Sequence, residues 1–194
     1  MAGKQAKLLT LAQVRLVEAH LTTTRHPDRN RVIFLLSLRA GLRAKEIAGL
    51  TWGMVTDAEG RLGDVIRLPD AVAKAGSGGA LPMAKDLRLA LGRLWESAKL
   101  PQADFHVVRT ERSTKTSAQA IINMFRGWYR ALGYEGCSSH SGRRTFITMT
   151  ARNIGRFGGS LRDVQALARH RSLAMTQRYI EIDSRAMIRV VDGW

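Results

Sequence analysis

The chain has 194 residues, of which 45% are hydrophobic, and it carries a formal charge of +15 at neutral pH. This length suits a single domain, and the hydrophobic content is enough for a packed core. Such a surplus of one sign disfavours an ordinary solvated surface. It favours a nucleic acid as partner, because a polyanion releases counterions when basic side chains neutralise it. A membrane surface is the alternative, but neither a clear basic amphipathic helix nor a lipidation signal is present.

Cysteine use and the length of the apolar runs predict a cytoplasmic protein. Cys137 is the only cysteine, so no intrachain disulfide can form. The apolar segment near the N-terminus is broken at Gln13 and Arg15, which does not fit a signal peptide. The longest strongly apolar run, Val32 to Leu38, is too short to span a bilayer, so no membrane association is predicted.

Three helices are predicted in the first fifty residues. Thr10 is the candidate N-cap of the first, in which apolar residues recur at helical spacing. A polar turn is predicted at residues 25–30. The second helix is mostly apolar, is expected at the centre of the core and ends at Gly41. The three helices are Leu8–His20, Arg31–Ala40 and Ala44–Leu50.

A small antiparallel sheet is predicted within residues 51–83. Two turn-forming segments, residues 57–63 and 74–79, separate residues that favour strands. The strand-favouring residues are Trp52, Val55, Val65, Ile66 and Leu68.

The rest of the chain is predicted to be helical. Gly133 ends one helix, glycines between residues 155 and 159 form a loop, and Ser160 with Asp163 has the pattern of a capping box. The helices are Leu87–Ala98, Ser117–Leu132, Ser141–Ile154, Leu161–Ala168, Ala174–Ile180 and Ser184–Val191. The sequence therefore predicts a mainly α fold with a small antiparallel β-sheet, in the α+β class.

An ordered set of arginine, lysine, histidine and tyrosine residues suits chemistry on a phosphodiester. Cleavage without a metal requires neutralisation of the phosphorane, a nucleophile that loses its proton and a leaving oxygen that gains one. Arginine clamps phosphate oxygens bidentately, and tyrosine can hold a covalent phosphoryl group. Taken alone, residues of these types at such positions are more often a surface charge, a helix cap or a core-edge aromatic. The set is Arg43, Lys74, His140, Arg143, His170 and Tyr179.

No metal or nucleotide cofactor is predicted. The histidines lack zinc-ligand spacing with carboxylates or with Cys137. The glycine-rich segment of residues 76–79 is not followed by the Gly-Lys-Ser/Thr of a nucleotide P-loop.

Three segments resemble the conserved boxes of the tyrosine recombinases, also called phage integrases. Residues 40–52, AGLRAKEIAGLTW, resemble the first box, and residues 139–146, SHSGRRTF, resemble the His-x-x-Arg box. Residues 168–180, ARHRSLAMTQRYI, resemble the final box, which holds the nucleophile. Lys74, eight residues before Pro82, matches the lysine of the family's β-hairpin. The resemblance extends from about Leu8 to the C-terminus.

The resemblance implies a fold and a reaction. The fold is a mostly helical catalytic domain with a small three-stranded sheet. The reaction is site-specific DNA recombination, either integration or excision. Tyr179 would form a 3′-phosphotyrosyl bond and free a 5′-hydroxyl, which then attacks the phosphotyrosine of a partner strand. Because the covalent link keeps the bond energy, neither ATP nor a metal is needed.

The resemblance also assigns roles to the remaining residues of the set. Arg43, Arg143 and His170 would hold the scissile phosphate. Lys74 would be the general acid, and His140 would assist proton transfer at Tyr179. Glu46, within the first box, would support that box structurally.

Two departures from the family pattern stand out. The residue before the second histidine is usually glycine, but here it is Arg169, a cation that either repositions His170 or adds a DNA contact. The family's N-terminal DNA-clamping domain has no room before Arg43. Residues 1–194 are therefore predicted to be one catalytic domain: a minimal recombinase, an excised domain or a remnant with another role. Its DNA binding is expected to be weaker, more salt-sensitive and less selective than that of a full recombinase.

Two other functions remain open on the sequence alone. One is a non-catalytic DNA-binding accessory protein with the same fold, and the other is a DNA-relaxing enzyme of the type IB topoisomerase kind. For the recombinase, we expect a monomer without DNA and a homotetramer on paired double-stranded sites. The apolar tail from Ser184 to Trp194 is expected to pack either on its own domain or on a neighbouring protomer.

Overall fold

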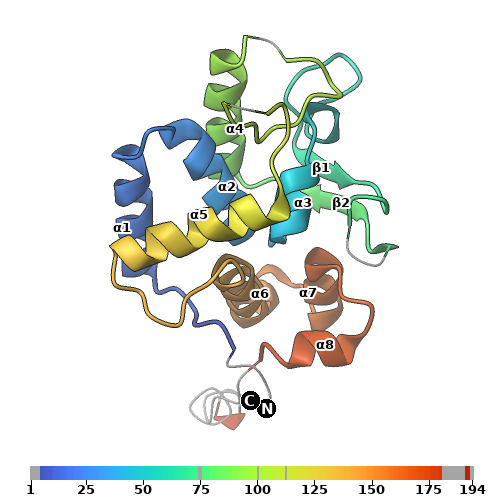
Figure 1. The fold of residues 1–194 in the computed structure, drawn as a ribbon. Helices are drawn as coiled ribbons and strands as arrows, with labels where there is room; N and C mark the ends of the chain where they lie inside the picture. Colours follow the sequence, from blue (N-terminus) through green and yellow to red (C-terminus); the bar gives the residue numbers. More distant parts are fainter. Residues whose placement is uncertain (1–4, 74–75, 100, 112, 181–190, 193–194) are drawn as a thin grey trace.

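The computed structural model describes residues 5–73, 76–99, 101–111, 113–180 and 191–192 (Figure 1). Helices dominate this part of the chain, and its two strands form a small antiparallel sheet, so the predicted fold class is confirmed. The α-helices are α1 (Leu11–Thr22), α2 (Pro27–Arg39), α3 (Ala44–Gly49), α4 (Lys85–Ser97), α5 (Ala118–Ala131), α6 (Ser141–Asn153), α7 (Leu161–Ala168) and α8 (Leu173–Gln177). The strands are β1 (Val65–Leu68) and β2 (Gly79–Pro82), and the 3-10 helices are η1 (Trp52–Met54) and η3 (Ile154–Phe157).

The residues at the starts of the first two helices explain where these helices begin. Thr10 and Gln13 form a reciprocal capping box, in which each side chain accepts a hydrogen bond from the other's backbone N–H. α2 begins at Pro27, so the polar turn predicted for residues 25–30 is wrong after His26. Proline is favoured at the first helical position, because its fixed φ suits the helix and its missing N–H has no helical acceptor there.

The sheet has two strands in the described residues, where the resemblance implied three. β1 and β2 pair antiparallel, with Val65 opposite Pro82 and Leu68 opposite Gly79. Before β1, an isolated bridge joins Thr56 to Leu62 and adds no further strand.

The segment around Trp52 was predicted as a strand, and this prediction is wrong. Residues 52–54 form the 3-10 helix η1, and the Val55 N–H donates back to the carbonyl of Trp52. The tight turn buries the Trp52 ring edge-on against Trp95, with ring centroids 4.9 Å apart. Aromatic and β-branched residues favour burial in general, so their clustering did not distinguish a strand from a buried turn.

Within the described residues, the hydrophobic core comprises one large cluster and one small cluster. The large cluster joins residues of α1 to α5, η1 and the sheet, and buries many aliphatic and aromatic side chains completely. The small cluster is built on Ile147, Val164 and Ala168, which come from α6 and α7. In Figure 1 the elements of the large cluster lie above α6, α7 and α8.

α6 joins the two parts of the molecule by packing against α2. The contact is close at Gly142, where an added Cβ would lie 2.5 Å from the hydroxyl oxygen of Ser37. Glycine is therefore needed at this position, because any side chain would push α6 away from α2. α7 packs on α6 and α8, so these last helices depend on α6 for their place.

The C-terminal helices are shorter than predicted. α8 ends at Gln177 and not at Ile180, so Tyr179 lies in the turn that follows it. Residues 154–157 form η3 where the sequence predicted the start of a loop. The last predicted helix, Ser184–Val191, lies outside the described residues apart from Val191.

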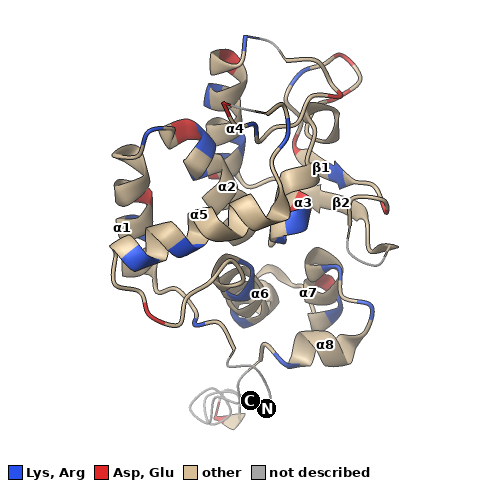
Figure 2. Cartoon of the chain, viewed as in Figure 1, with Lys and Arg blue, Asp and Glu red and all other residues tan. Residues whose placement is uncertain are grey.

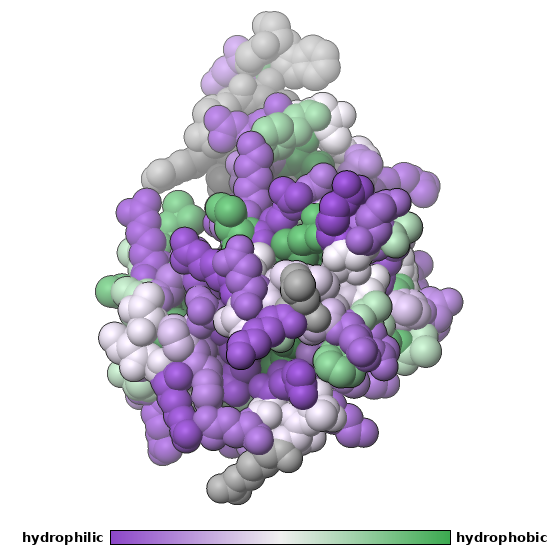
Figure 3. Space-filling model, turned by 90° about the horizontal axis from the view of Figure 1, so that it is seen from above, coloured by the Kyte–Doolittle hydropathy of each residue, from purple (hydrophilic) through white to green (hydrophobic). Residues whose placement is uncertain are grey.

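One face of the molecule is strongly polar. The face seen in Figure 3 is mostly hydrophilic, with hydrophobic residues in separate patches. Among the described helices, the longest is α5 with 14 residues, and none combines the length and apolar character needed to cross a membrane.

Candidate functional site

Arg43 lies directly before α3 and caps it. Two residues earlier, Gly41 has a left-handed φ of +61°, and an added Cβ there would lie 2.7 Å from the Phe146 ring, so this turn requires glycine. The fully buried carboxylate of Glu46 accepts hydrogen bonds from the Arg43 N–H at 2.8 Å and from its Nη1 at 2.9 Å. Glu46 thus fixes Arg43 at the start of α3, as the first-box pattern predicted.

Arg143, in the first turn of α6, is buried and bridges two distant segments. Its Nη1 donates to the carbonyl of Gly41, and its Nη2 donates to the carbonyl of Ala168 at 2.6 Å. Burial lowers the pKa of Arg143 to about 10, and the nearby Arg43 adds to this shift. The guanidinium therefore stays charged at neutral pH and links the loop before α3 to the end of α7.

Arg169 makes a buried ion pair that the sequence analysis missed. It caps α7 in the left-handed conformation, with φ 52° and ψ 47°. Its side chain is 4% exposed and donates to both oxygens of Glu46, with Nη1–Oε1 at 3.2 Å and Nη2–Oε2 at 2.8 Å. The unusual arginine at this position was the only sequence signal, and it did not identify a partner 123 residues away.

His170 and Tyr179 lie against each other after α7 and α8. Their rings stack with centroids 5.4 Å apart and planes 27° apart. The His170 Nδ1 lies 3.0 Å from the hydroxyl oxygen of the buried Thr176, and Thr148 donates its hydroxyl to the Tyr179 carbonyl at 3.2 Å. Thr176 was not among the predicted site residues. The ring stacking and these hydrogen bonds thus fix how the His170 and Tyr179 rings lie relative to each other.

These residues form a cluster with a surplus of positive charge. Three guanidinium groups, those of Arg43, Arg143 and Arg169, face one carboxylate, that of Glu46. Burial would raise the Glu46 pKa, but the hydrogen bonds from Arg169 and Arg43 outweigh it and lower that pKa. Burial lowers the His170 pKa to about 4, and the three arginines add to this effect. The cluster therefore favours an anion. Figure 2 shows basic residues beside α3 and on α6 and α7, the elements from which the cluster is built.

An open hollow of about 400 Å³ adjoins the cluster. It is bounded by the β1–β2 turn on one side and by the C-terminal end of α7 on the other. The residues that line it include Gly76, Ser77, Gly78, Arg162, Arg169 and His170. Lys74, the predicted general acid, lies outside the described residues, so only its sequence neighbours 76–78 are placed beside His170.

His140 lies at the N-terminal end of α6 and is exposed. Its backbone N–H donates to the Ser138 hydroxyl at 3.2 Å, and the buried Arg143 follows it by one helical turn. The structure therefore gathers Arg43, Arg143, His170 and Tyr179, while the catalytic part predicted for His140 stays a prediction.

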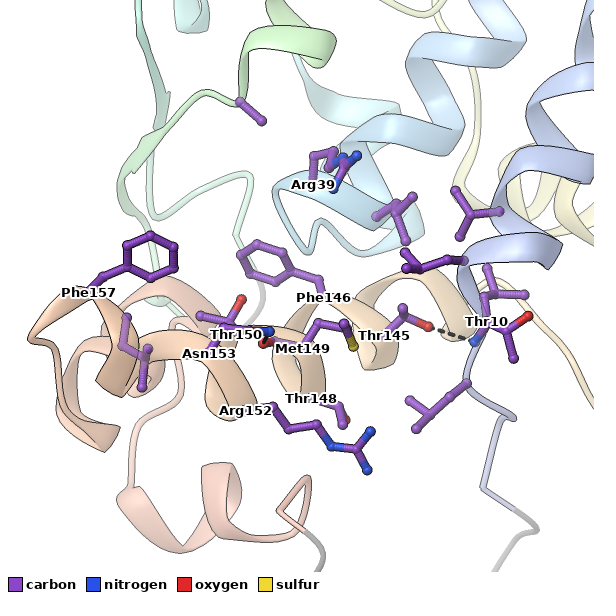
Figure 4. Close-up of a pocket in the computed structure, with 17 residues that line it drawn as sticks. Thr10, Arg39, Thr145, Phe146, Thr148, Met149, Thr150, Arg152, Asn153 and Phe157 are labelled. Carbon is purple, nitrogen blue, oxygen red and sulfur yellow. Dashed lines mark hydrogen bonds between the residues drawn. The ribbon is translucent and has the colours of Figure 1, made fainter. Parts of the chain in front are cut away.

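A larger groove of about 630 Å³ lies along another side of α6 (Figure 4). Its walls come from the segment before α1, the end of α2, α6 and η3, and they are mostly apolar. Thr145 on its floor accepts a hydrogen bond from the Leu9 N–H at 2.9 Å. None of the predicted site residues that the structure describes lines this groove, and its apolar walls do not suit a phosphate.

The chain matches a known protein family over most of its length. The model of the phage integrase family matches residues 7–185, which is nearly the whole chain. The chain belongs to the phage integrase family. The match includes both ends of the charged cluster, from the loop before α3 to the segment after α8.

Relatives of this phage integrase family member include recombinases. Tyrosine recombinase XerC from Shewanella amazonensis is 27% identical over 168 residues, which cover 85% of this chain and 53% of the relative. The chain thus spans about half the length of that relative. The crystal structure of XerA recombinase is similar, with a TM-score of 0.74 at 20% identity over 100% of this chain and 65% of that one. The structure of the Tn1549 transposon integrase in complex with a circular intermediate DNA is also similar. Its TM-score is 0.73 at 18% identity, over 99% of this chain and 66% of that one.

Proposed function

We propose that the chain cuts and rejoins DNA at specific sites through a 3′-phosphotyrosyl intermediate on Tyr179, and so carries out recombination. Its membership of the phage integrase family supports this function. The observation that carries the proposal is the Tyr179 phenol stacked on His170 within a cluster of arginines that lacks a matching number of carboxylates.

The charge of the cluster suits the chemistry. A DNA phosphodiester carries one negative charge, and attack by a phenolate gives a phosphorane with about two. Three guanidinium groups facing one carboxylate leave two positive charges, so the cluster offers more stabilisation to the phosphorane than to the substrate. Arg43, Arg143 and the neutral His170 hold the non-bridging oxygens in this proposal.

Two proton transfers complete the reaction. The Tyr179 hydroxyl loses its proton as its oxygen bonds to phosphorus, and His140 assists this transfer. The bond from phosphorus to the 5′ oxygen breaks, and Lys74 donates a proton to that oxygen. The 5′-hydroxyl of a partner strand then reverses these steps, so each bond broken is replaced by one formed and no cofactor is consumed.

Double-stranded DNA is the proposed partner. The net charge of +15 supports it, as does the DNA bound to the similar Tn1549 integrase. We further propose a monomer without DNA and a homotetramer on paired sites, since recombination exchanges four strands. Light scattering of the protein with and without paired DNA sites tests this assembly, and a stable tetramer without DNA contradicts it.

A suicide substrate tests the proposed chemistry. Nicked duplexes that cover the DNA flanking the gene are incubated with the protein in EDTA, and covalent adducts are separated under denaturing conditions. The parent chain is expected to form an adduct despite the chelator. Tyr179→Phe is expected to form none, because it lacks the nucleophilic oxygen. Tyr134→Phe is the matched control, since the Tyr134 hydroxyl is buried without a hydrogen-bond partner in the described structure.

The other outcomes are equally informative. DNA binding that is unchanged in Tyr179→Phe, with no adduct from the parent on any flanking duplex, favours the accessory-protein function. Relaxation of supercoiled DNA without a specific site favours the topoisomerase function.

A further inference from the structure

Glu46 lies between Arg43, which caps the start of its own helix, and Arg169, which follows α7. Each of its oxygens accepts one hydrogen bond from Arg43 and one from Arg169. The Arg169 bonds run from Nη1 to Oε1 and from Nη2 to Oε2, in the two-pronged geometry that suits a guanidinium and a carboxylate. Glu46 is therefore saturated by these two partners.

Two features of Arg169 are unfavourable in free energy: its backbone conformation and the burial of its charged side chain. A left-handed backbone is unfavourable for a residue other than glycine, and Arg169 has a φ of 52°. The Arg169 Nε is buried and has no partner among the described residues, and burial of a charged group is unfavourable in itself. A glycine at this position would avoid both the backbone strain and the burial of a charge. The left-handed turn therefore does not explain why the residue is arginine, whereas the ion pair with Glu46 does.

Arg169 determines how Arg43 uses its guanidinium. Arg43 gives Nη1 to Glu46, while its Nε and Nη2 have no hydrogen-bond partner in the described structure. Glu46 is fully buried and cannot turn to water. If Arg169 were absent, two carboxylate lone pairs would lose their donors, and the nearest guanidinium able to replace them is that of Arg43. A second bond to Glu46 would draw Arg43 inward, away from an anion in the cluster.

We propose that Arg169 is a positioning residue: it occupies Glu46 and so keeps the outer edge of the Arg43 guanidinium available to a DNA phosphate. This proposal rests on the proposed function, because it takes the phosphate to be that of the cleaved DNA. Both Nη atoms of Arg169 donate to Glu46, so in this proposal Arg169 does not hold the phosphate although it borders the hollow. It acts through Glu46, which distinguishes this role from a DNA contact and from a purely structural turn.

The test compares two substitutions that suit the left-handed backbone. Arg169→Gly and Arg169→Asn both tolerate a positive φ and both lack the guanidinium. Each is expected to lower the single-turnover rate of adduct formation by between about ten- and a hundredfold, through misplacement of Arg43. The dissociation constant for the duplex is expected to stay within about twofold of the parent value, because Arg169 does not contact DNA. Arg169→Lys is expected to recover part of the rate.

A double variant separates this role from a structural one. In Arg169→Gly with Glu46→Gln, the neutral amide no longer draws Arg43 inward, so the double variant is expected to cleave faster than Arg169→Gly alone. Arg93→Gln, which removes an exposed charge from α4, is the control for net charge. Parental rates in Arg169→Gly, or a double variant no faster than the single one, overturn the proposal.

A second readout does not require cleavage. The unfolding temperature is measured in potassium phosphate and in potassium chloride of equal ionic strength. The parent is expected to gain stability from phosphate, Arg169→Gly to lose that gain, and the double variant to regain it. This pattern without any covalent adduct refutes the proposed function and leaves the positioning role standing. A parent without the gain, or Arg169→Gly with the full gain, overturns the positioning role.

Discussion

The part of the molecule built from α1 to α5 and the part built from α6 to α8 are held by different forces. The first buries a large apolar cluster, and the ion pairs between its helices, such as Arg39–Asp86, are partly exposed to solvent. The second buries only a small cluster around Ile147, Val164 and Ala168. Hydrogen bonds from Arg143 and Arg169 join its α7 end to the loop before α3 and to Glu46.

This difference explains why the candidate site lies where it does. Charged side chains at the junction between the parts hold the C-terminal helices in place and also leave a surplus of positive charge. Residues proposed to bind phosphate therefore contribute to stability as well, whereas residues of the large core contribute to stability alone. Substitutions on the two sides of this division are expected to behave differently.

The largest expected effect is that of Arg143→Ala, at the junction. The substitution leaves the Gly41 and Ala168 carbonyls without their donor and removes a proposed phosphate ligand. We expect a loss of about 3 kcal/mol in the free energy of unfolding. We also expect a fall of about a thousandfold in the rate of adduct formation. Urea denaturation and single-turnover cleavage measure the two effects. Unchanged stability with lost cleavage would show that the junction does not depend on Arg143.

Leu36→Ala tests the other side of the division. Leu36 lies in α2 and is fully buried in the large cluster. Its truncation is expected to lower the free energy of unfolding by about 3 kcal/mol, through lost burial and the cavity left behind. The cleavage rate per folded molecule is expected to match that of the parent at a temperature where both are folded. A rate that falls with stability would contradict a division between core and site.

The pH dependence of stability sharpens the comparison at His170. Its pKa is about 4 in the folded chain and about 6.5 when unfolded. The unfolded state therefore binds more protons between these values, and the contribution of His170 to stability is present above pH 6.5 and lost as the pH falls toward 4. From pH 7 to pH 4.5, the parent is expected to lose about 2 kcal/mol more than His170→Gln. If urea denaturation gives the same dependence of unfolding free energy on pH for the parent and for His170→Gln, the imidazole of His170 is not buried in its neutral form.

The smallest expected effect is that of Thr176→Val. The substitution keeps the shape of a fully buried side chain but removes the hydroxyl that lies within hydrogen-bond distance of the His170 Nδ1. We expect a loss of about 1 kcal/mol in the free energy of unfolding and slower adduct formation, because the imidazole loses its orientation. Thr176→Ser retains the hydroxyl and is expected to cleave at nearly the parental rate. Equal loss in both variants would indicate that the methyl group matters and the hydrogen bond does not.

Local signals in the sequence predicted much of the fold. The capping residues Thr10 and Ser160 and the helix-ending Gly41 lie where the pattern required. Pro27 was taken as part of a turn although it is the first residue of α2, and Trp52 was taken as a strand residue although it is buried in η1. In both cases the same residue type suits two local structures. Proline is also favoured at the first position of a helix, and Trp52 is buried in a turn where a strand would equally suit its residue type.

The sequence indicated four residues that the structure brings together, but it did not indicate the hydrogen bonds that hold them. Arg43, Arg143, His170 and Tyr179 were singled out from their order along the chain, and the structure brings them together. The ion pair between Arg169 and Glu46 joins residues 123 positions apart, and no local pattern encodes such a contact. A pattern of residue types predicts which side chains take part, while the hydrogen bonds that orient them depend on the assembled fold.

The most direct test of the central claim is to find which atom of the protein becomes bonded to DNA. The trapped adduct is digested with nuclease and trypsin, and the modified peptide is sequenced by mass spectrometry. The account predicts a nucleotide phosphate on Tyr179, at the start of the peptide of residues 179–185. A phosphate on any other side chain, or cleaved DNA without a covalent link to Tyr179, would contradict it.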